Sequence, residues 1–296
     1  MITIESYRDT HATAVAMLFD RIPELPSTSE KSFRSFAAMA FNRGARDFLV
    51  ARDGTRIVAL LTSTVLDDAS PSIRHFRVAV DPAYRRRGIG RRLLSEVEVQ
   101  GEAPILQCNS QRSWATANEA LERAGFHVAH TEHLMRLEQA PPSLSAPPAF
   151  TVRKATESDD SDWMALHRRG YGHREDFFPL EPADLVAERG RPGFVLLLAE
   201  RDKEPIGLCH GLHHDEREGL INSVVVAPEH RRQGIGAALV LAVIGRLRAS
   251  RPVVTLNVQS TNTPAIGLYK QIGFTTYDEI LTCQRRVPEA LSCPTS

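Results

Sequence analysis

The stretch VVVAPEHRRQGIGAALV, Val224–Val240, decides the fold of this chain. A run of valines ends near a proline, and the turn that follows carries Arg231 and Arg232 and then the glycines Gly234 and Gly236. β-Branched residues favour a strand, and the long apolar segment after the glycines is typical of a buried helix. The stretch therefore predicts a strand, a glycine-rich turn and the start of a helix.

A turn of this kind predicts an anion site. The N–H groups in the first turn of a helix have no partners within the helix, and the helix dipole adds positive character there. Glycines such as Gly234 and Gly236 let a diphosphate approach the backbone closely, and arginine side chains add charge at the rim. We therefore expect a phosphate-containing ligand at the start of this helix.

The same pattern occurs twice in the chain. The first copy reads VAVDPAYRRRGIGRRLL, from Val78, and its Gly88 lies 146 residues before Gly234. A second pair of matching segments, ERAGF and KQIGF, ends at Phe126 and Phe274, which are 148 residues apart. Two landmarks repeated in the same order indicate a duplicated domain.

A proline-rich segment separates the two copies. Residues 139–150, QAPPSLSAPPAF, contain four prolines and no charge, a composition that favours extended, poorly packed chain. The length of 296 residues also suits two domains better than one. We expect a first domain at 1–138, a linker at 139–149 and a second domain at 150–296.

Strand patterns alternate with helical patterns in the second half. The expected strands are Phe150–Ala155, Phe194–Glu200, Pro205–His214, Leu220–Pro228, Val253–Gln259 and the closing segment from Phe274. The expected helices follow Ser158, Gly234 and Thr263. The first half shows the same order, so each domain should be α/β, with a mixed, mostly antiparallel sheet flanked by helices.

Composition excludes several classes of function. The chain has 36 Lys plus Arg and 36 Asp plus Glu, so no global field favours nucleic acid or an acidic membrane. No segment reaches the roughly 18 apolar residues of a membrane span, and the first residues lack a signal-peptide pattern. The cysteines show no metal-like spacing. We expect reduced thiols in a cytoplasmic protein without a metal; the cysteines are Cys108, Cys209, Cys283 and Cys293.

The repeated turn resembles a known family. VVVAPEHRRQGIGAAL resembles motif A of the GCN5-related N-acetyltransferases, the GNAT superfamily, in which Arg/Gln-x-x-Gly-x-Gly/Ala binds the pyrophosphate of coenzyme A. NTPAIGLYKQIGF, Asn262–Phe274, resembles motif B of the same family. The resemblance implies acetyl-CoA as co-substrate, with Asn262 in contact with it and Tyr269 near its sulfur. It also implies that the backbone of Val224–Val226 pairs with the pantetheine arm.

The resemblance extends to a full set of cofactor-binding positions in both copies. In the second half they are Val224, Val225, Val226, Arg231, Arg232, Gln233, Gly234, Ile235, Gly236, Ala237 and Asn262. In the first half they are Val78, Ala79, Val80, Arg85, Arg86, Arg87, Gly88, Ile89 and Gly90.

The implied chemistry is direct acetyl transfer from the thioester to an amine. Tyr269, whose hydroxyl has an ordinary pKa near 10, is protonated at neutral pH and can donate to the leaving thiolate. The family's usual carboxylate base falls on Leu220 here, so the base is open. Glu218 lies two residues earlier on the same strand face, and histidines that titrate near neutral pH are alternatives. These histidines are His210, His213 and His214.

The first copy departs from this pattern. Aligning Phe126 with Phe274 places Leu121 opposite Tyr269 and Trp114 opposite Asn262. The first domain should therefore keep the phosphate cradle but transfer acetyl groups poorly. The alternative is that Ser110 or Asn109 replaces the tyrosine through a water molecule.

The acceptor is expected to be the amine of a small molecule. Acidic residues in the segment between the first two helices of the second half could attract a cationic amine: Glu175, Asp176, Glu181 and Asp184. Two other functions fit the same motifs, a non-catalytic acyl-CoA-binding sensor or scaffold and a protein N-terminal acetyltransferase. The sequence leaves the oligomeric state open.

Overall fold

The structure is a computed structural model that describes residues 1–25, 27–38, 42, 45–66, 71–99, 103–141, 149–172 and 179–287. It forms two compact units. Unit 1 contains Met1–Ser110, Trp114–Ala129 and Leu281–Ser296, and unit 2 contains Gln111–Ser113 and His130–Ile280. Each unit has a mixed sheet with helices, which confirms the predicted fold class.

Unit 1 is built mainly from the first half of the chain. Its elements are β1 (Ile2–Ser6), α1 (Ala12–Phe19), α2 (Glu30–Ala37), β2 (Leu49–Asp53), β3 (Arg56–Leu66), β4 (Ile73–Val80), α3 (Ile89–Val99), β5 (Ile105–Gln111) and α4 (Ala115–Arg123). The strand order is β1-β2-β3-β4-β5-β12, in which β1 to β4 pair antiparallel and β4 pairs parallel with β5.

Unit 2 repeats this plan with the second half. Its elements are β6 (His127–Leu137), β7 (Thr151–Lys154), α5 (Asp160–Tyr171), α6 (Pro182–Arg189), β8 (Val195–Arg201), β9 (Glu204–His213), β10 (Glu218–Val226), α7 (Ile235–Leu247), β11 (Val253–Gln259), α8 (Thr263–Ile272) and β12 (Thr275–Arg286). The strand order is β12-β6-β11-β10-β9-β8-β7, with β10 and β11 parallel.

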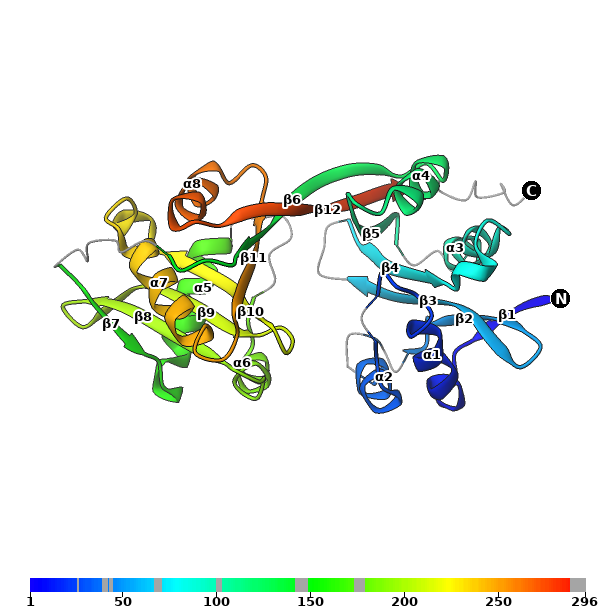
Figure 1. Cartoon of the computed structure of the whole chain (residues 1–296), viewed down its shortest axis with the longest axis horizontal. Coiled ribbons are helices and arrows are strands. Elements are labelled where there is room, and N and C mark those ends of the chain that lie inside the picture. The colour runs from blue at the N-terminus through cyan, green and yellow to red at the C-terminus, as the bar shows by residue number, and fades with distance from the viewer. Residues whose placement is uncertain are drawn as a thin grey trace, which may run out of the picture. The chain divides into compact units, whose positions relative to one another are not determined.

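Helices cover both faces of the unit 2 sheet, with α7 on one face and α5 on the other (Figure 1). Successive side chains of a strand point to opposite faces. Val225 accordingly packs in the cluster of Trp163 and Leu166 from α5, whereas Val224 and Val226 pack in the cluster of α7. Because both faces are covered, the strands are continuously apolar instead of alternating.

The two halves of the sequence exchange strand ends: the end of β6, from the first half, belongs to unit 2, and the end of β12, from the second half, belongs to unit 1. Residues 130–137 of β6 belong to unit 2, where Leu137 pairs with Val254 of β11. From β12, Leu281 and Cys283 are buried in the core of unit 1. The compact units therefore differ from the predicted domains 1–138 and 150–296.

The physical reason for the difference is that strand patterning is local and pairing is not. An alternating strand looks the same in sequence whichever sheet it joins. The composition of the predicted linker likewise carries no information on the strands before and after it. Of the linker, residues 142–148 lie outside the described residues.

Because the end of β12 lies in unit 1, the stability of unit 1 should depend on Leu281, whose side chain is 4% exposed. Leu281→Ala should lower the free energy of unfolding of unit 1 by about 2–4 kcal/mol, because a buried leucine is replaced by a cavity. The chain has two tryptophans, Trp114 in unit 1 and Trp163 in unit 2. Denaturant unfolding followed by fluorescence in Trp163→Phe and Trp114→Phe backgrounds therefore reads the units separately.

The matched control is Val128→Ala, at a position in unit 1 that is 49% exposed, and it should change neither transition. If Leu281→Ala shifts the Trp163 transition and leaves the Trp114 transition unchanged, the end of β12 belongs to unit 2 and the assignment to unit 1 is contradicted.

Candidate functional site

The two central strands of unit 2 pair over part of their length. The parallel ladder of β10 and β11 runs from Glu218, opposite Val253, to Ile221, opposite Leu256. The ladder of β10 with β9 continues to Val226 and has a register shift between Ile221 and Ser223. A bulge of this kind bends a strand and increases its twist. The second half of β10 therefore has one edge paired with β9 and the other edge turned away from β11.

Unit 1 has the same divergence. β4 pairs with β5 from Ile73, opposite Ile105, to His75, opposite Gln107, whereas its ladder with β3 continues to Val80. In both units the strands separate just before the glycine-rich turn. Each unit therefore combines an open strand edge with a helix N-terminus, which is where the sequence predicts the ligand.

The turns have the same backbone shape in the two copies. Arg86 and Gly88 have φ of 63° and 75°, and Arg232 and Gly234 have φ of 64° and 78°. A positive φ is uncommon for residues other than glycine, so its repetition at equivalent arginines shows a conserved turn geometry. Turns in which successive N–H groups point inward form anion-binding concavities. The conformation supports the predicted phosphate cradle.

The first arginine of each turn is fixed to the preceding strand. Arg231 Nε donates to Val226 O at 3.2 Å, and Arg85 Nε donates to Val80 O at the same distance. Arg85 also forms a two-fold ion pair with Glu24, at 2.8 and 2.9 Å, which lowers the pKa of that carboxyl to about 2. The charge of Arg85 is thus already neutralised in unit 1, whereas Arg231 has no carboxylate partner among the described residues.

The other predicted contact residues divide between surface and core. Ile89 and Ile235 bury their side chains in the two cores, so only their backbone can face a ligand. Gln233 accepts a hydrogen bond from Arg201 at 2.8 Å, and the Arg87 guanidinium lies over the Tyr84 ring. The exposed side chains of the two turns are Arg86, Arg87, Arg231, Arg232 and Gln233.

Tyr269 lies on the buried face of α8 and is 7% exposed. Its ring meets that of Phe274 edge-on, with 5.9 Å between centroids. Burial raises the pKa of its hydroxyl, and the neighbouring Tyr171 and Cys209 raise it further. The hydroxyl is therefore protonated throughout the neutral range.

The structure places the predicted counterparts of the first copy at equivalent positions. Asn262 and Trp114 precede α8 and α4 with nearly equal φ and ψ, −84° and 66° against −85° and 60°. The Asn262 side chain accepts from the backbone N–H of Ala265 and so caps its helix, whereas Trp114 makes no such bond. Asn262 therefore has a structural role in addition to the predicted ligand contact.

Tyr171 is a site residue that sequence reasoning missed. Its hydroxyl accepts from Val224 N at 3.2 Å and donates to Val224 O at 3.1 Å. The end of α5 reaches β10 because Gly170 has no side chain: a Cβ there would meet Val225 Cγ1 at 2.7 Å. In the sequence, the only indication of this contact was Gly170 directly before Tyr171, since a glycine near a helix end can mark a close approach to another element.

Both halves of the chain are similar to known acetyltransferases. Residues 157–274 match the model of the acetyltransferase (GNAT) family, and residues 44–128 match that of an acetyltransferase (GNAT) domain. Mycothiol acetyltransferase of Streptomyces griseus is 30% identical over 256 residues, covering 79% of this chain and 78% of the relative. That of Thermomonospora curvata is 31% identical over 213 residues, covering 68% and 70%. This chain is an N-acetyltransferase of the GNAT family.

A solved structure shows the same tandem fold. A GCN5-related N-acetyltransferase from Sphaerobacter thermophilus superimposes with a TM-score of 0.76 at 22% identity, covering 97% of this chain and 96% of that one. A tandem GNAT protein from the clavulanic acid biosynthesis pathway gives 0.74 at 17% identity, covering 98% and 100%. GNAT acetyltransferases use acetyl-CoA, so the two turns are candidate coenzyme A sites.

The candidate bases of this GNAT protein lie at different places in unit 2. Glu218 is at the start of β10, six residues before Val224, which is roughly 20 Å along a strand. His213 bonds Ser250 Oγ at 3.0 Å, and His214 is exposed in the turn between β9 and β10. His210 is different, because it pairs in register with Ser223 at the bulge.

His210 is buried among aromatic rings. Its ring lies 5.3 Å from Trp163 and 5.1 Å from Phe194, and its Nε2 is 3.5 Å from Glu188 Oε2. Burial, with a contribution from the Arg191 charge, lowers its pKa to about 4. The imidazole is therefore neutral at pH 7.

The predicted acidic and hydroxyl alternatives have local partners where they are described. The Asp184 side chain accepts from Glu181 N at 2.9 Å, so these two residues cap α6. Glu175 and Asp176 lie outside the described residues. In unit 1, Ser110 donates to Asn118 at 2.6 Å, and Asn109 accepts from Thr282 at 3.2 Å.

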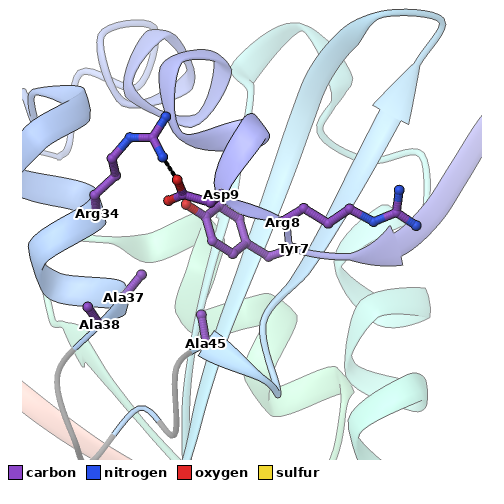
Figure 2. A pocket seen from close by; sticks show the side chains of 7 residues that line it. All are labelled: Tyr7, Arg8, Asp9, Arg34, Ala37, Ala38 and Ala45. Atoms are coloured by element: carbon purple, nitrogen blue, oxygen red, sulfur yellow. Dashed lines mark ion pairs between the residues drawn. The ribbon is translucent and has the colours of Figure 1, made fainter.

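Unit 1 also contains a cavity of about 350 Å³ between the end of β1 and α2. Figure 2 shows Asp9 paired with Arg34 at one side of it, next to the ring of Tyr7. The cavity is lined by Tyr7, Arg8, Asp9, Arg34, Ala37, Ala38 and Ala45. None of these residues belongs to the glycine-rich turn, so the cavity is distinct from the predicted phosphate cradle.

The described part of the chain has neither a cluster of metal-ligating residues nor a helix that could span a membrane. Within the described ranges, no group of three or more His, Cys, Asp or Glu residues could hold a metal ion. No helix in that part of the chain is long and apolar enough to cross a membrane.

The low pKa of His210 predicts how unit 2 responds to acid. Since the folded-state pKa of about 4 lies below the unfolded value of 6.5, the unfolded chain takes up a proton first as the pH falls. The free energy of unfolding of unit 2 therefore falls as the pH drops from 6.5 towards 4, and it is lower by about 2 kcal/mol at pH 5. His210→Asn should remove about that much of the difference in unfolding free energy between pH 7.5 and pH 5.

The measurement is denaturant unfolding at the two pH values, followed by Trp163 fluorescence in a Trp114→Phe background. His214→Asn, at an exposed position, is the control and should leave the pH dependence as it is. Equal pH dependence with and without His210 would show that this histidine is not buried in neutral form.

Proposed function

We propose that the chain transfers an acetyl group from acetyl-CoA to the amine of a small molecule, and that the second copy carries out the reaction. The observation that carries this proposal is the open edge of β10, which ends at an intact cradle and lies in the same unit as Tyr269. The mycothiol acetyltransferases to which the chain is similar support a small-molecule acceptor, and the amine that those enzymes acetylate is the first candidate.

In this proposal the diphosphate of coenzyme A binds at the N-terminus of α7 and the pantetheine arm follows β10. Backbone groups of alternate residues point to the same side of a strand. The bonds from Tyr171 to Val224 and from Arg231 to Val226 show that these two valines direct their groups to the open side. Of the predicted valines, Val224 and Val226 are therefore the ones that can pair with pantetheine.

Tyr171 then stands in the place of the ligand. Its hydroxyl accepts the Val224 N–H bond in the structure, and an acetyl oxygen would accept the same bond. Binding of acetyl-CoA would displace the hydroxyl and exchange one set of hydrogen bonds for another. The Val224 N–H would then stabilise the oxyanion that forms when the amine attacks the carbonyl carbon.

The chemical step needs a proton for the leaving group and a site for the amine's proton. When the carbon–sulfur bond breaks, the thiolate takes a proton from Tyr269, which is protonated because burial raises its pKa. The amine's proton is not assigned to His210, because the burial that lowers its pKa to about 4 makes it a weak base.

The first copy is proposed to have little or no transferase activity. Leu121 replaces the tyrosine at the equivalent place on α4, and Trp114 replaces the helix-capping asparagine. The first arginine of the turn, Arg85, is also already paired with the Glu24 carboxylate. The turn itself keeps its shape, so coenzyme A binding without transfer is compatible with this unit.

The cradle can be tested in the two copies separately. A valine at position 236 would place methyl groups over the first turn of α7, and it should abolish acetyl transfer by the full-length chain. A Cβ there meets Leu268 Cδ2 at 3.4 Å, an ordinary contact, so the fold should tolerate the change. Gly90→Val makes the matched change in α3 and should leave turnover within about twofold.

Turnover with acetyl-CoA and calorimetric titration of coenzyme A are measured for both proteins. Because each unit contains residues from both halves, the substitutions are made in the intact chain. Loss of turnover in Gly90→Val, with Gly236→Val fully active, would contradict the proposal and assign the reaction to the first copy.

The role of Tyr269 predicts a defect in the chemical step. Tyr269→Phe keeps the buried ring and removes the donor, and the single-turnover rate should fall about 10²-fold, the lower range for loss of a general acid. The affinity for acetyl-CoA should be nearly unchanged. The comparison variant is Tyr171→Phe, which removes a bond that the ligand must displace and should instead lower the KM for acetyl-CoA. A Tyr269→Phe protein as fast as the unaltered enzyme would leave this tyrosine a packing residue.

A further inference from the structure

Two cysteines from opposite halves of the sequence face each other across neighbouring strands of unit 1. Strand β5 lies next to β12 in the sheet. Side-chain bonds join Gln284 Nε2 to Gln107 Oε1 at 2.7 Å and Thr282 Oγ1 to Asn109 Oδ1 at 3.2 Å. In both pairs the two residue numbers have the same sum, as antiparallel pairing requires. Cys108 and Cys283, which lie between these pairs, are therefore directly opposite.

The backbone bonds fix the geometry of this pair. Val287 N donates to Pro104 O and Arg112 N donates to Glu279 O, both at 2.9 Å and both in the same register. Hydrogen-bonded pairs recur at every second residue of an antiparallel ladder. Cys108 is an even number of residues from Pro104 and from Arg112, so it belongs to a hydrogen-bonded pair, with its Cα about 5.5 Å from that of Cys283. That Cα separation is within the range that disulfides span, about 4.4–6.8 Å, but the Cβ atoms of a hydrogen-bonded pair, about 5.5 Å apart, must approach to about 4 Å for the bond to form.

Both thiols point into the same core. Cys108 and Cys283 are buried in one cluster with Phe126 and Leu281, on the face opposite the Gln107–Gln284 pair, since side chains alternate along a strand. The two sulfurs therefore share one space between the strands.

The contact between the thiols makes one of them more acidic. The neighbouring Cys108 thiol lowers the pKa of Cys283, while the same neighbour and burial raise the pKa of Cys108. Cys209, buried alone in unit 2, has its pKa raised by burial. Since the thiolate is the nucleophile in cysteine chemistry, Cys283 is the sulfur that reacts first.

We propose that Cys108 and Cys283 are a modification site, a dithiol that hydrogen peroxide converts to a reversible cross-strand disulfide. The Cys283 thiolate attacks one peroxide oxygen, the O–O bond breaks and, after proton transfer, water leaves, so that Cys283 becomes a sulfenic acid. Cys108 then loses its proton and attacks that sulfur, the S–S bond forms, and hydroxide leaves and takes up the proton as water. Two thiols lose two electrons in total and the peroxide gains them.

The bond would join the two sequence halves covalently. Cys108 is on a strand of the first half, and Cys283 is on the strand end that the second half contributes to unit 1. A disulfide here closes the long loop that contains unit 2 and prevents β12 from leaving the unit 1 sheet. Because the peptide chain need not move far to form the bond, the reduced and oxidised proteins should share one fold.

The experiment oxidises the intact chain with hydrogen peroxide, at concentrations that leave the Trp163 signal native, and maps the products by peptide mass spectrometry after alkylation. We expect a cross-linked peptide joining Cys108 to Cys283. The thermal midpoint reported by Trp114 should rise by about 5 °C, since disulfides across long loops stabilise by a few kcal/mol, and a dithiol reductant should reverse the rise.

Cys108→Ala and Cys283→Ala should each abolish the cross-link and the rise, and Cys209→Ala should change neither. Alanine is used because it suits a buried site. As a second readout that needs no variant, the two native thiols should disappear together from the count of alkylatable groups. A sulfinic acid at Cys283, pairing of either cysteine with Cys293, or two intact thiols after peroxide has oxidised Cys293 would each overturn the proposal.

Discussion

The structure of unit 2 depends on the divergence of β10 from β11. Beyond the bulge, β10 has backbone donors and acceptors on one side with no neighbouring strand, and buried groups of this kind need partners. In the structure the Tyr171 hydroxyl bonds the N–H and C=O of Val224, and Arg231 donates to the C=O of Val226. In the proposed function the same exposed backbone binds the ligand, because an extended ligand with amide groups can replace those partners.

The two copies show which parts of this arrangement belong to the fold and which to the chemistry. The left-handed conformations at Arg86 and Gly88 occur in the copy that has Leu121 where the other copy has Tyr269. Ile89 and Ile235 explain part of this shared conformation, because each anchors the first turn of its helix in the core. The turn is thus under a folding constraint as well as the proposed binding one, so its shape alone does not distinguish a copy that transfers acetyl groups from one that does not.

Local patterns were sufficient to predict much of this molecule. The strand, turn and helix around Gly234 could be predicted because valine content, glycine spacing and apolar periodicity are all contained in a short window. The ion pair of Glu24 with Arg85 and the bond of Tyr171 to Val224 join residues far apart in sequence, and no window contains both partners. The position of β12 was missed for the same reason.

The exchange of strand ends has a consequence for biosynthesis. Residues 281–287, which pack beside β5, are translated after everything else in unit 1 that the structure describes. Until they emerge from the ribosome, β5 has an unpaired edge, and an unpaired edge is a template for wrong association. Neither half of the sequence contains every strand of one unit, so a gene fragment that encodes one half alone would lack a strand end that its sheet needs.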